Sequence, residues 1–147
     1  MKSTWHHHLQ NSIALVLITL FTYAATDKLL HLRGFMRVLK ASPLLNHFVT
    51  WLPWLIIAAE YLVVTCLLIT PLRLAGLLGA FALMLLFTGY IGYMLATASS
   101  LPCSCGGILK QLSWKTHFGI NLLLTMLAAY ALRIQIKNSR PQPNAPA

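Results

Sequence analysis

Long uncharged apolar stretches dominate the hydrophobic pattern of this chain. A helix needs around 20 mostly apolar residues to cross a bilayer core of about 30 Å. Four stretches come close to that, and we predict a membrane-spanning helix in each of them: 12–31, 50–70, 73–98 and 116–133. The pattern therefore predicts an all-α, polytopic membrane protein, built as a four-transmembrane-helix bundle.

The connection between the first two predicted spans has a different, amphipathic pattern. Apolar residues recur there at helical spacing and basic residues mark the other side: Leu29, Leu32, Phe35, Met36 and Leu39 against Arg33, Arg37 and Lys40. Such a segment is typical of a helix that lies in the membrane interface. We predict an amphipathic interfacial helix here, closed by Ser42-Pro43.

One domain accounts for nearly the whole chain. We predict a single membrane domain over 1–137 and a disordered tail over 138–147, which has three prolines in its last seven residues. The first span could alternatively be a cleaved signal peptide, since Lys2 precedes an apolar run ending in Tyr23-Ala24-Ala25. The apolar character continues through Leu30, which favours a retained helix.

Composition and charge exclude a soluble domain. The chain is 58% hydrophobic and only 9% charged, against roughly 25% charged residues in soluble domains. The net charge of +9 comes from basic residues that stand singly at the edges of apolar runs, without a nucleic-acid motif. We therefore expect contact with lipid headgroups and no nucleic-acid partner. The small residues Gly76, Gly79 and Ala80 in the third span indicate close helix packing.

The segment Leu101-Pro102-Cys103-Ser104-Cys105-Gly106-Gly107 carries the residues best suited to chemistry. Thiols at i and i+2 can approach disulfide distance in a strained ring, and strained, exposed disulfides exchange readily. A permanent staple is a weak interpretation, because so small a ring restrains little of the unfolded chain. Inert thiols, or a soft-metal site completed by Met94 or a histidine, stay open as alternatives.

Polar residues inside the predicted spans are further candidates. Glu60 lies at the middle of the second span, where a charge is costly, so it needs a proton or a partner. It either accepts protons or ties helices together through Asn121, Thr88 or a tyrosine hydroxyl. His117 opens the fourth span and either delivers protons near Cys105 or caps a polar boundary.

Three other features of the sequence favour structural interpretations. Asp27 and Lys28, at the end of the first span, are expected to form an interfacial pair. Cys66, without a cationic neighbour, is expected to be a small buried apolar residue. The tract His6 to His8 is a weak metal-binding pattern, and we predict no metal site.

Together these residues resemble the MauE branch of the DoxX-like membrane proteins. The resemblance runs from about Asn11 to Leu132 and is most specific in the cysteine segment. The residues that carry it are Tyr23 to Leu29, Ser42 to Leu45, Leu52-Pro53 with Glu60, and Cys103 to Gly107 followed by Ser113-Trp114 and His117.

The resemblance implies a redox-associated four-helix bundle that acts in methylamine utilisation. Such proteins are thought to help a thioredoxin-like partner to form disulfides in methylamine dehydrogenase. DoxX relatives are linked to quinones, so a membrane quinone is the one cofactor that the resemblance suggests. The chain departs from membrane thiol oxidoreductases of the vitamin K epoxide reductase type, since it has no Cys-x-x-Cys and one closely spaced pair.

The functional hypothesis is thiol-disulfide exchange through Cys103 and Cys105 with an extracytoplasmic thioredoxin-like protein. If the chain is an enzyme, it is a component of a thiol-disulfide oxidoreductase, with Glu60 and His117 handling protons. Disulfides persist outside the cytosol, so this chemistry places the cysteine loop outside the inner membrane and both termini in the cytoplasm. The alternative is a non-catalytic accessory or scaffold subunit, with or without a bound metal. A transporter is a third possibility, but a single intramembrane charge provides few groups that could bind a substrate on its way across the membrane. The oligomeric state and the physiological partner are not predicted.

Overall fold

Helices make up the described part of the chain. The computed structural model describes residues 2–97 and 114–139, and none of these residues is in a β-strand. The elements are α1 (Lys2–Leu30), α2 (Leu32–Ala41), η1 (Asn46–Phe48), α3 (Leu52–Leu68), η2 (Thr70–Leu72), α4 (Arg73–Thr97) and α5 (Trp114–Ser139), where η denotes a one-turn 3-10 helix. The all-α prediction is confirmed.

Three of the described helices are long and apolar enough to cross a membrane. They are His8–Leu30 within α1, Thr70–Thr97, which includes α4, and Lys115–Ser139 within α5. The apolar helix α3 is shorter, with 17 residues and a length of about 26 Å. Pro71 lies in the 3-10 turn η2 that separates α3 from α4, so the predicted end of the second span is correct to within three residues.

The outer helices extend beyond their predicted spans. The helix α1 begins at Lys2 rather than at 12, and α5 continues to Ser139, two residues into the predicted tail. A helix does not need to stop where its residues become polar, because polar side chains at its ends can reach water. The remainder of the predicted tail lies outside the described residues.

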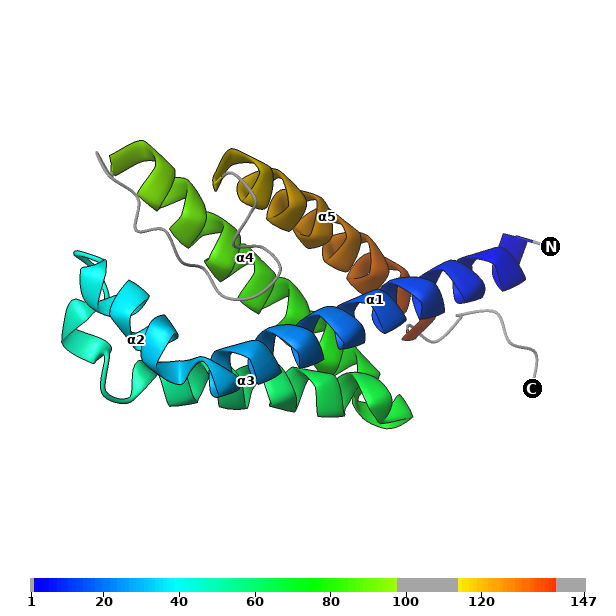
Figure 1. The fold of residues 1–147 in the computed structure, drawn as a ribbon. Coiled ribbons are helices and arrows are strands. Elements are labelled where there is room, and N and C mark those ends of the chain that lie inside the picture. Colours follow the sequence, from blue (N-terminus) through cyan, green and yellow to red (C-terminus); the bar gives the residue numbers. More distant parts are fainter. Residues whose placement is uncertain (1, 98–113, 140–147) are drawn as a thin grey trace.

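The four long helices form two packed pairs, α1 with α3 and α4 with α5, which also contact each other through α3–α4 and α1–α5. Figure 1 shows the two pairs diverging toward the end of the bundle where α4 stops and α5 starts. We call this the loop end; it is formed by Leu30, Leu52, Thr97 and Trp114. The opposite end, called the terminal end, is formed by His8, Leu68, Arg73 and Ser139.

The interior of the bundle is apolar and all four long helices contribute to it. Leu17 and Phe21 of α1 are fully enclosed, so a cleaved first segment would remove part of the core. The main buried cluster comprises Ile13, Leu17, Phe21, Val63, Val64, Leu67, Leu77, Ala80, Met84, Ala128 and Ala131.

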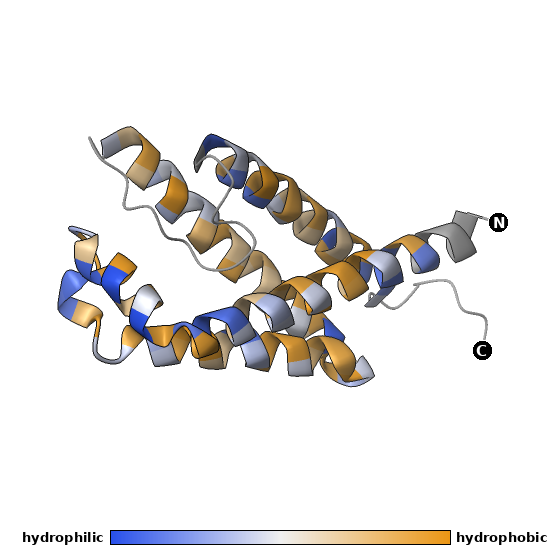
Figure 2. Cartoon of the chain, in the orientation of Figure 1, coloured by the Kyte–Doolittle hydropathy of each residue, from blue (hydrophilic) through white to orange (hydrophobic). Residues whose placement is uncertain are grey.

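Large apolar side chains also cover the outside of the bundle. Leu15, Leu62, Leu86 and Met126, one from each long helix, are all at least 60% exposed. Figure 2 shows hydrophobic residues along the long helices, with hydrophilic ones gathered at helix ends and on α2. A surface of this kind fits lipid rather than water.

Small residues set the distance between α3 and α4. A Cβ on Gly76 would lie 2.7 Å from the backbone nitrogen of Leu67, and one on Gly79 would lie 2.8 Å from a methyl group of Val63. Ala80 is fully buried in the same contact region. The predicted packing role of these three residues is confirmed.

Candidate site at the loop end

A buried ion pair joins α1 to α3. The Lys28 ammonium donates to Glu60 Oε1 at 2.6 Å, and the Glu60 side chain is completely shielded from solvent. Lys28 lies two residues before the end of α1, and its long stem lets the ammonium reach back toward the middle of α3. The Glu60 carboxylate, for which the sequence analysis identified no cationic partner, is therefore paired with the ammonium of Lys28 from the preceding helix.

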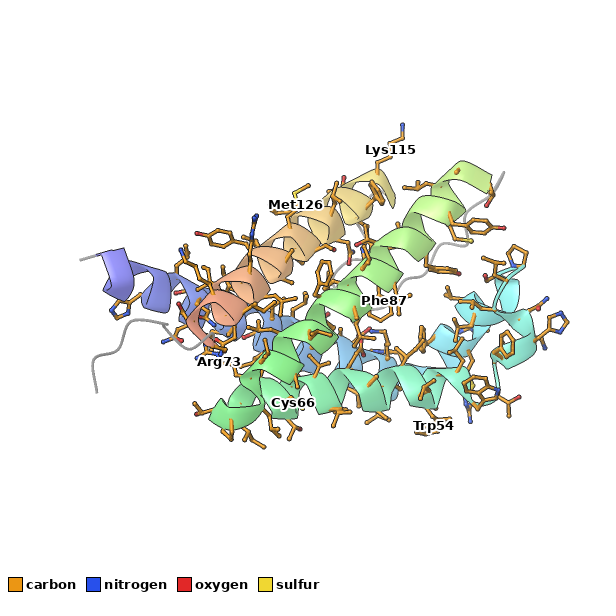
Figure 3. All side chains as sticks on the ribbon, turned by 180° about the vertical axis from the view of Figure 1, so that it is seen from behind. Trp54, Cys66, Arg73, Phe87, Lys115 and Met126 are labelled. Atoms are coloured by element: carbon orange, nitrogen blue, oxygen red, sulfur yellow. The ribbon has the colours of Figure 1, made fainter. Side chains whose placement is uncertain are left out.

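Aromatic rings from two other helices surround the Lys28 ammonium. It lies 5.4 Å from the ring centroid of Phe87 on α4 and 5.9 Å from that of Phe35 on α2. Figure 3 shows Phe87 on the inner side of α4, whereas Met126 and Lys115 point away from the bundle. Ring faces attract a cation, and this attraction is strongest where water is excluded. Four helices thus meet at one cation.

The second carboxylate oxygen of Glu60 is also buried. Among the described residues, Oε2 has no hydrogen-bond partner. A carboxylate oxygen enclosed in this way is an acceptor for a proton or for an incoming N–H or O–H group. Its position makes Glu60 the strongest candidate for proton handling in the described part of the chain.

The partners of Glu60 differ from those predicted. Thr88 donates to Met84 O at 2.7 Å and lies 3.0 Å from the Thr125 hydroxyl, so it ties α4 to α5 instead of contacting Glu60. The Asn121 amide donates to His117 O at 3.1 Å. Both residues satisfy their hydrogen bonds locally, within one turn of their own helices or across the α4–α5 contact.

The expected interfacial pair of Asp27 and Lys28 is also wrong. Asp27 pairs with His31 at 3.1 Å, one helical turn further on, and Lys28 turns inward to Glu60. Adjacent residues point in different directions on a helix, so Asp27 and Lys28 do not face each other and each pairs with a different residue.

His117 lies near this cluster but does not belong to it. It is half-buried at the end of the first turn of α5, close enough to Lys28 for the two side chains to interact electrostatically. In the described part of the chain no hydrogen bond joins His117 to Glu60. With Asn121 and Thr125, at intervals of four residues, it forms a polar stripe on α5 that faces Thr88.

The candidate thiols Cys103 and Cys105 lie outside the described residues. Their segment follows Thr97, where α4 ends, and precedes Trp114, where α5 begins, and both of these residues lie at the loop end. Met94, considered above as a metal ligand, is buried in α4, and Cys66 is a half-buried free thiol in α3. No group of three metal-binding side chains occurs among the residues that the structure describes.

Lys28 is the residue that sequence reasoning missed. The chain has only two acidic residues, and one of them lies at the middle of a span. The one signal in the sequence that could have pointed to this partner is a cation on a long stem near the end of the preceding span.

Comparison with curated proteins and with solved structures finds no match for the chain. The sequence model of the family described as "Methylamine utilisation protein MauE" matches residues 6–134, which include every described helix except the ends of α1 and α5. The match covers far more than half of the chain and agrees with the helical, membrane-type fold. The chain therefore belongs to the MauE family of membrane proteins, which is linked to methylamine utilisation.

Proposed function

We propose that this MauE-family protein is a membrane component of thiol-disulfide exchange, in which Cys103 and Cys105 act on an extracytoplasmic thioredoxin-like protein. One observation carries the proposal furthest. The buried Lys28–Glu60 pair connects the loop-end part of α1 to the middle of α3, and the cysteine segment is covalently attached to the bundle at the loop end. A thiol pair and a shielded proton acceptor in one membrane protein are suited to a reaction that moves electrons and protons together.

The exchange balances as a two-electron transfer. A thiolate of the partner attacks the Cys103–Cys105 disulfide, the S–S bond breaks, and a mixed disulfide forms with one of the two sulfurs. The second partner thiolate then displaces that sulfur. The partner leaves as a disulfide, and Cys103 and Cys105 are left as a dithiol that holds the two electrons and two protons.

Reoxidation of the dithiol releases those two protons. Glu60 is proposed to accept one of them through Oε2, while Lys28 donates to its other carboxylate oxygen. His117 is the proposed second proton acceptor, since it lies in the first turn of α5, the helix that follows the cysteine segment in the sequence.

A membrane quinone is the proposed acceptor of the electrons. The Lys28 ammonium can donate to a carbonyl oxygen, and the Phe35 and Phe87 rings beside it offer apolar faces, so this group of residues fits a quinone headgroup. When bound, a quinone would act as the oxidant that accepts two electrons from the dithiol.

Four membrane crossings are part of the proposal. Arg73 at the start of α4 donates to Asn11 near the start of α1 at 2.7 Å, whereas Lys28 near the end of α1 reaches Glu60. The chain must therefore run from the loop end to the terminal end between α1 and α4, and α3 makes that passage. Its 17 residues are at the short limit for a spanning helix. With four crossings both termini lie on one side, in the cytoplasm by our proposal, and α2 lies in the outer interface of the inner membrane.

The proposal is tested on the purified protein with Cys66 replaced by alanine. The sample is equilibrated in glutathione redox buffers, and the remaining thiols are counted by maleimide-polyethylene glycol gel shift. Two thiols that titrate together, and catalysed oxidation of a reduced thioredoxin-like domain that is lost in C103S/C105S, are the expected results. Oxidation that survives this double substitution would instead favour the accessory or scaffold subunit.

A further inference from the structure

Helix α2 carries basic side chains on its exposed face. Arg33, Arg37 and Lys40 are exposed, whereas Val38 and Leu39 on the other side are buried against the bundle. We call the three basic residues the cationic face. Their spacing of three and four residues places them on one side of the helix.

Neither acidic side chain of the protein pairs with the cationic face. The sequence contains two acidic residues, Asp27 and Glu60. Asp27 pairs with His31, and Glu60 is enclosed with Lys28. Among the described residues, none of the three cations of this face forms an ion pair.

Aromatic residues next to α2 indicate the depth of this segment in the membrane. Phe48, Trp51 and Trp54 are 45%, 53% and 52% exposed, and the first two rings pack edge to face with centroids 5.7 Å apart. Figure 3 shows Trp54 pointing away from the bundle at the start of α3. Exposed tryptophans at the end of a membrane helix are typical of the headgroup level.

We infer that the cationic face binds the headgroups of anionic phospholipids. The aromatic side chains hold α2 at headgroup depth, where an anionic phosphate is the nearest partner for an arginine or a lysine. An acidic surface of a soluble protein would fit the same charges less well, because the adjacent exposed tryptophans favour lipid contact. This inference needs the membrane setting of the bundle and is independent of the thiol chemistry.

The experiment measures which lipid surrounds Trp51 and Trp54. The full chain, with Trp5 and Trp114 replaced by phenylalanine, is reconstituted in mixed phosphatidylcholine and phosphatidylglycerol vesicles. Brominated acyl chains, placed on one lipid class at a time, quench tryptophan fluorescence on contact. The expected result is quenching by brominated phosphatidylglycerol well above its bulk share, with selectivity that falls about fivefold for each cation removed at low salt.

Matched variants separate this surface from a general effect of charge. R33Q/R37Q should lower the selectivity, R33K/R37K should retain it, and R133Q/K137Q, which removes equal charge from exposed positions at the terminal end, should leave it unchanged. Circular dichroism confirms that each variant is folded. Quenching at the bulk share in the parent protein, or equal selectivity in R33Q/R37Q, would overturn the inference and point to an acidic protein partner.

Discussion

The Lys28–Glu60 pair gives the sharpest energetic prediction for this protein. Lys28 Nζ lies 2.6 Å from Glu60 Oε1, and the carboxylate is fully enclosed. Removal of one partner therefore leaves the other as a buried charge without compensation. Such a loss costs about 3–5 kcal/mol, whereas replacement of both partners by apolar groups is often neutral. We expect Lys28→Met to destabilise the fold by that amount. Glu60→Leu should cost less, because Lys28 is 19% exposed and can turn toward the loop end.

A double-mutant cycle measures the coupling. The purified full chain, the two single variants and K28M/E60L are unfolded in mixed micelles by titration with sodium dodecyl sulfate and followed by far-ultraviolet circular dichroism. The double variant should be close to the parent, which corresponds to a coupling of at least about 2 kcal/mol. Asp27→Asn is the control, because its partner His31 is 57% exposed and such pairs contribute less than about 1 kcal/mol. Additive single effects, within about 0.5 kcal/mol, would refute the buried pair.

Two further predictions concern helix packing. Gly76→Ala should destabilise by about 1–3 kcal/mol in the same titration, because its Cβ meets the rigid backbone nitrogen of Leu67, whereas Gly89→Ala, with nothing within 4 Å, should be neutral or stabilising. Equal effects of the two alanines would contradict the close contact of α3 and α4. Thr88→Val and Thr125→Val should show a coupling of about 0.6 kcal/mol in a double-mutant cycle, since their hydroxyls lie 3.0 Å apart in the apolar interior. A coupling of zero would mean that these hydroxyls bond only to their own helices.

Helix positions and small-residue packing were predictable from the sequence. Membrane helices must satisfy their backbone hydrogen bonds internally, so apolar length alone locates them, and Pro71 marks the break between α3 and α4. Gly76 was identified as a packing residue because interhelical contact in lipid depends on small residues. Helix ends were less predictable, since α1 and α5 continue through polar residues beyond the apolar stretches.

The partners of the candidate site residues were not predictable from local patterns. Glu60 was recognised because a charge in a span is rare, but its partner lies 32 residues away on another helix. Local spacing favoured the neighbour pair of Asp27 and Lys28, whereas the fold turns these side chains to different depths. Long-range pairing of side chains depends on how helices pack, and one sequence does not display that packing.

The side of the membrane on which Cys103 and Cys105 react is the central claim, and thiol labelling in intact cells tests it most directly. Cells that express the Cys66→Ala variant are treated with a membrane-impermeant maleimide before and after mild reduction. A single-cysteine variant with Ser139→Cys at the terminal end reports the cytoplasmic side. We predict labelling of Cys103 and Cys105 only after reduction, with the Ser139→Cys control labelled only in opened cells. Labelling of the pair without reduction, or only in opened cells, would contradict an exchangeable disulfide on the outer face.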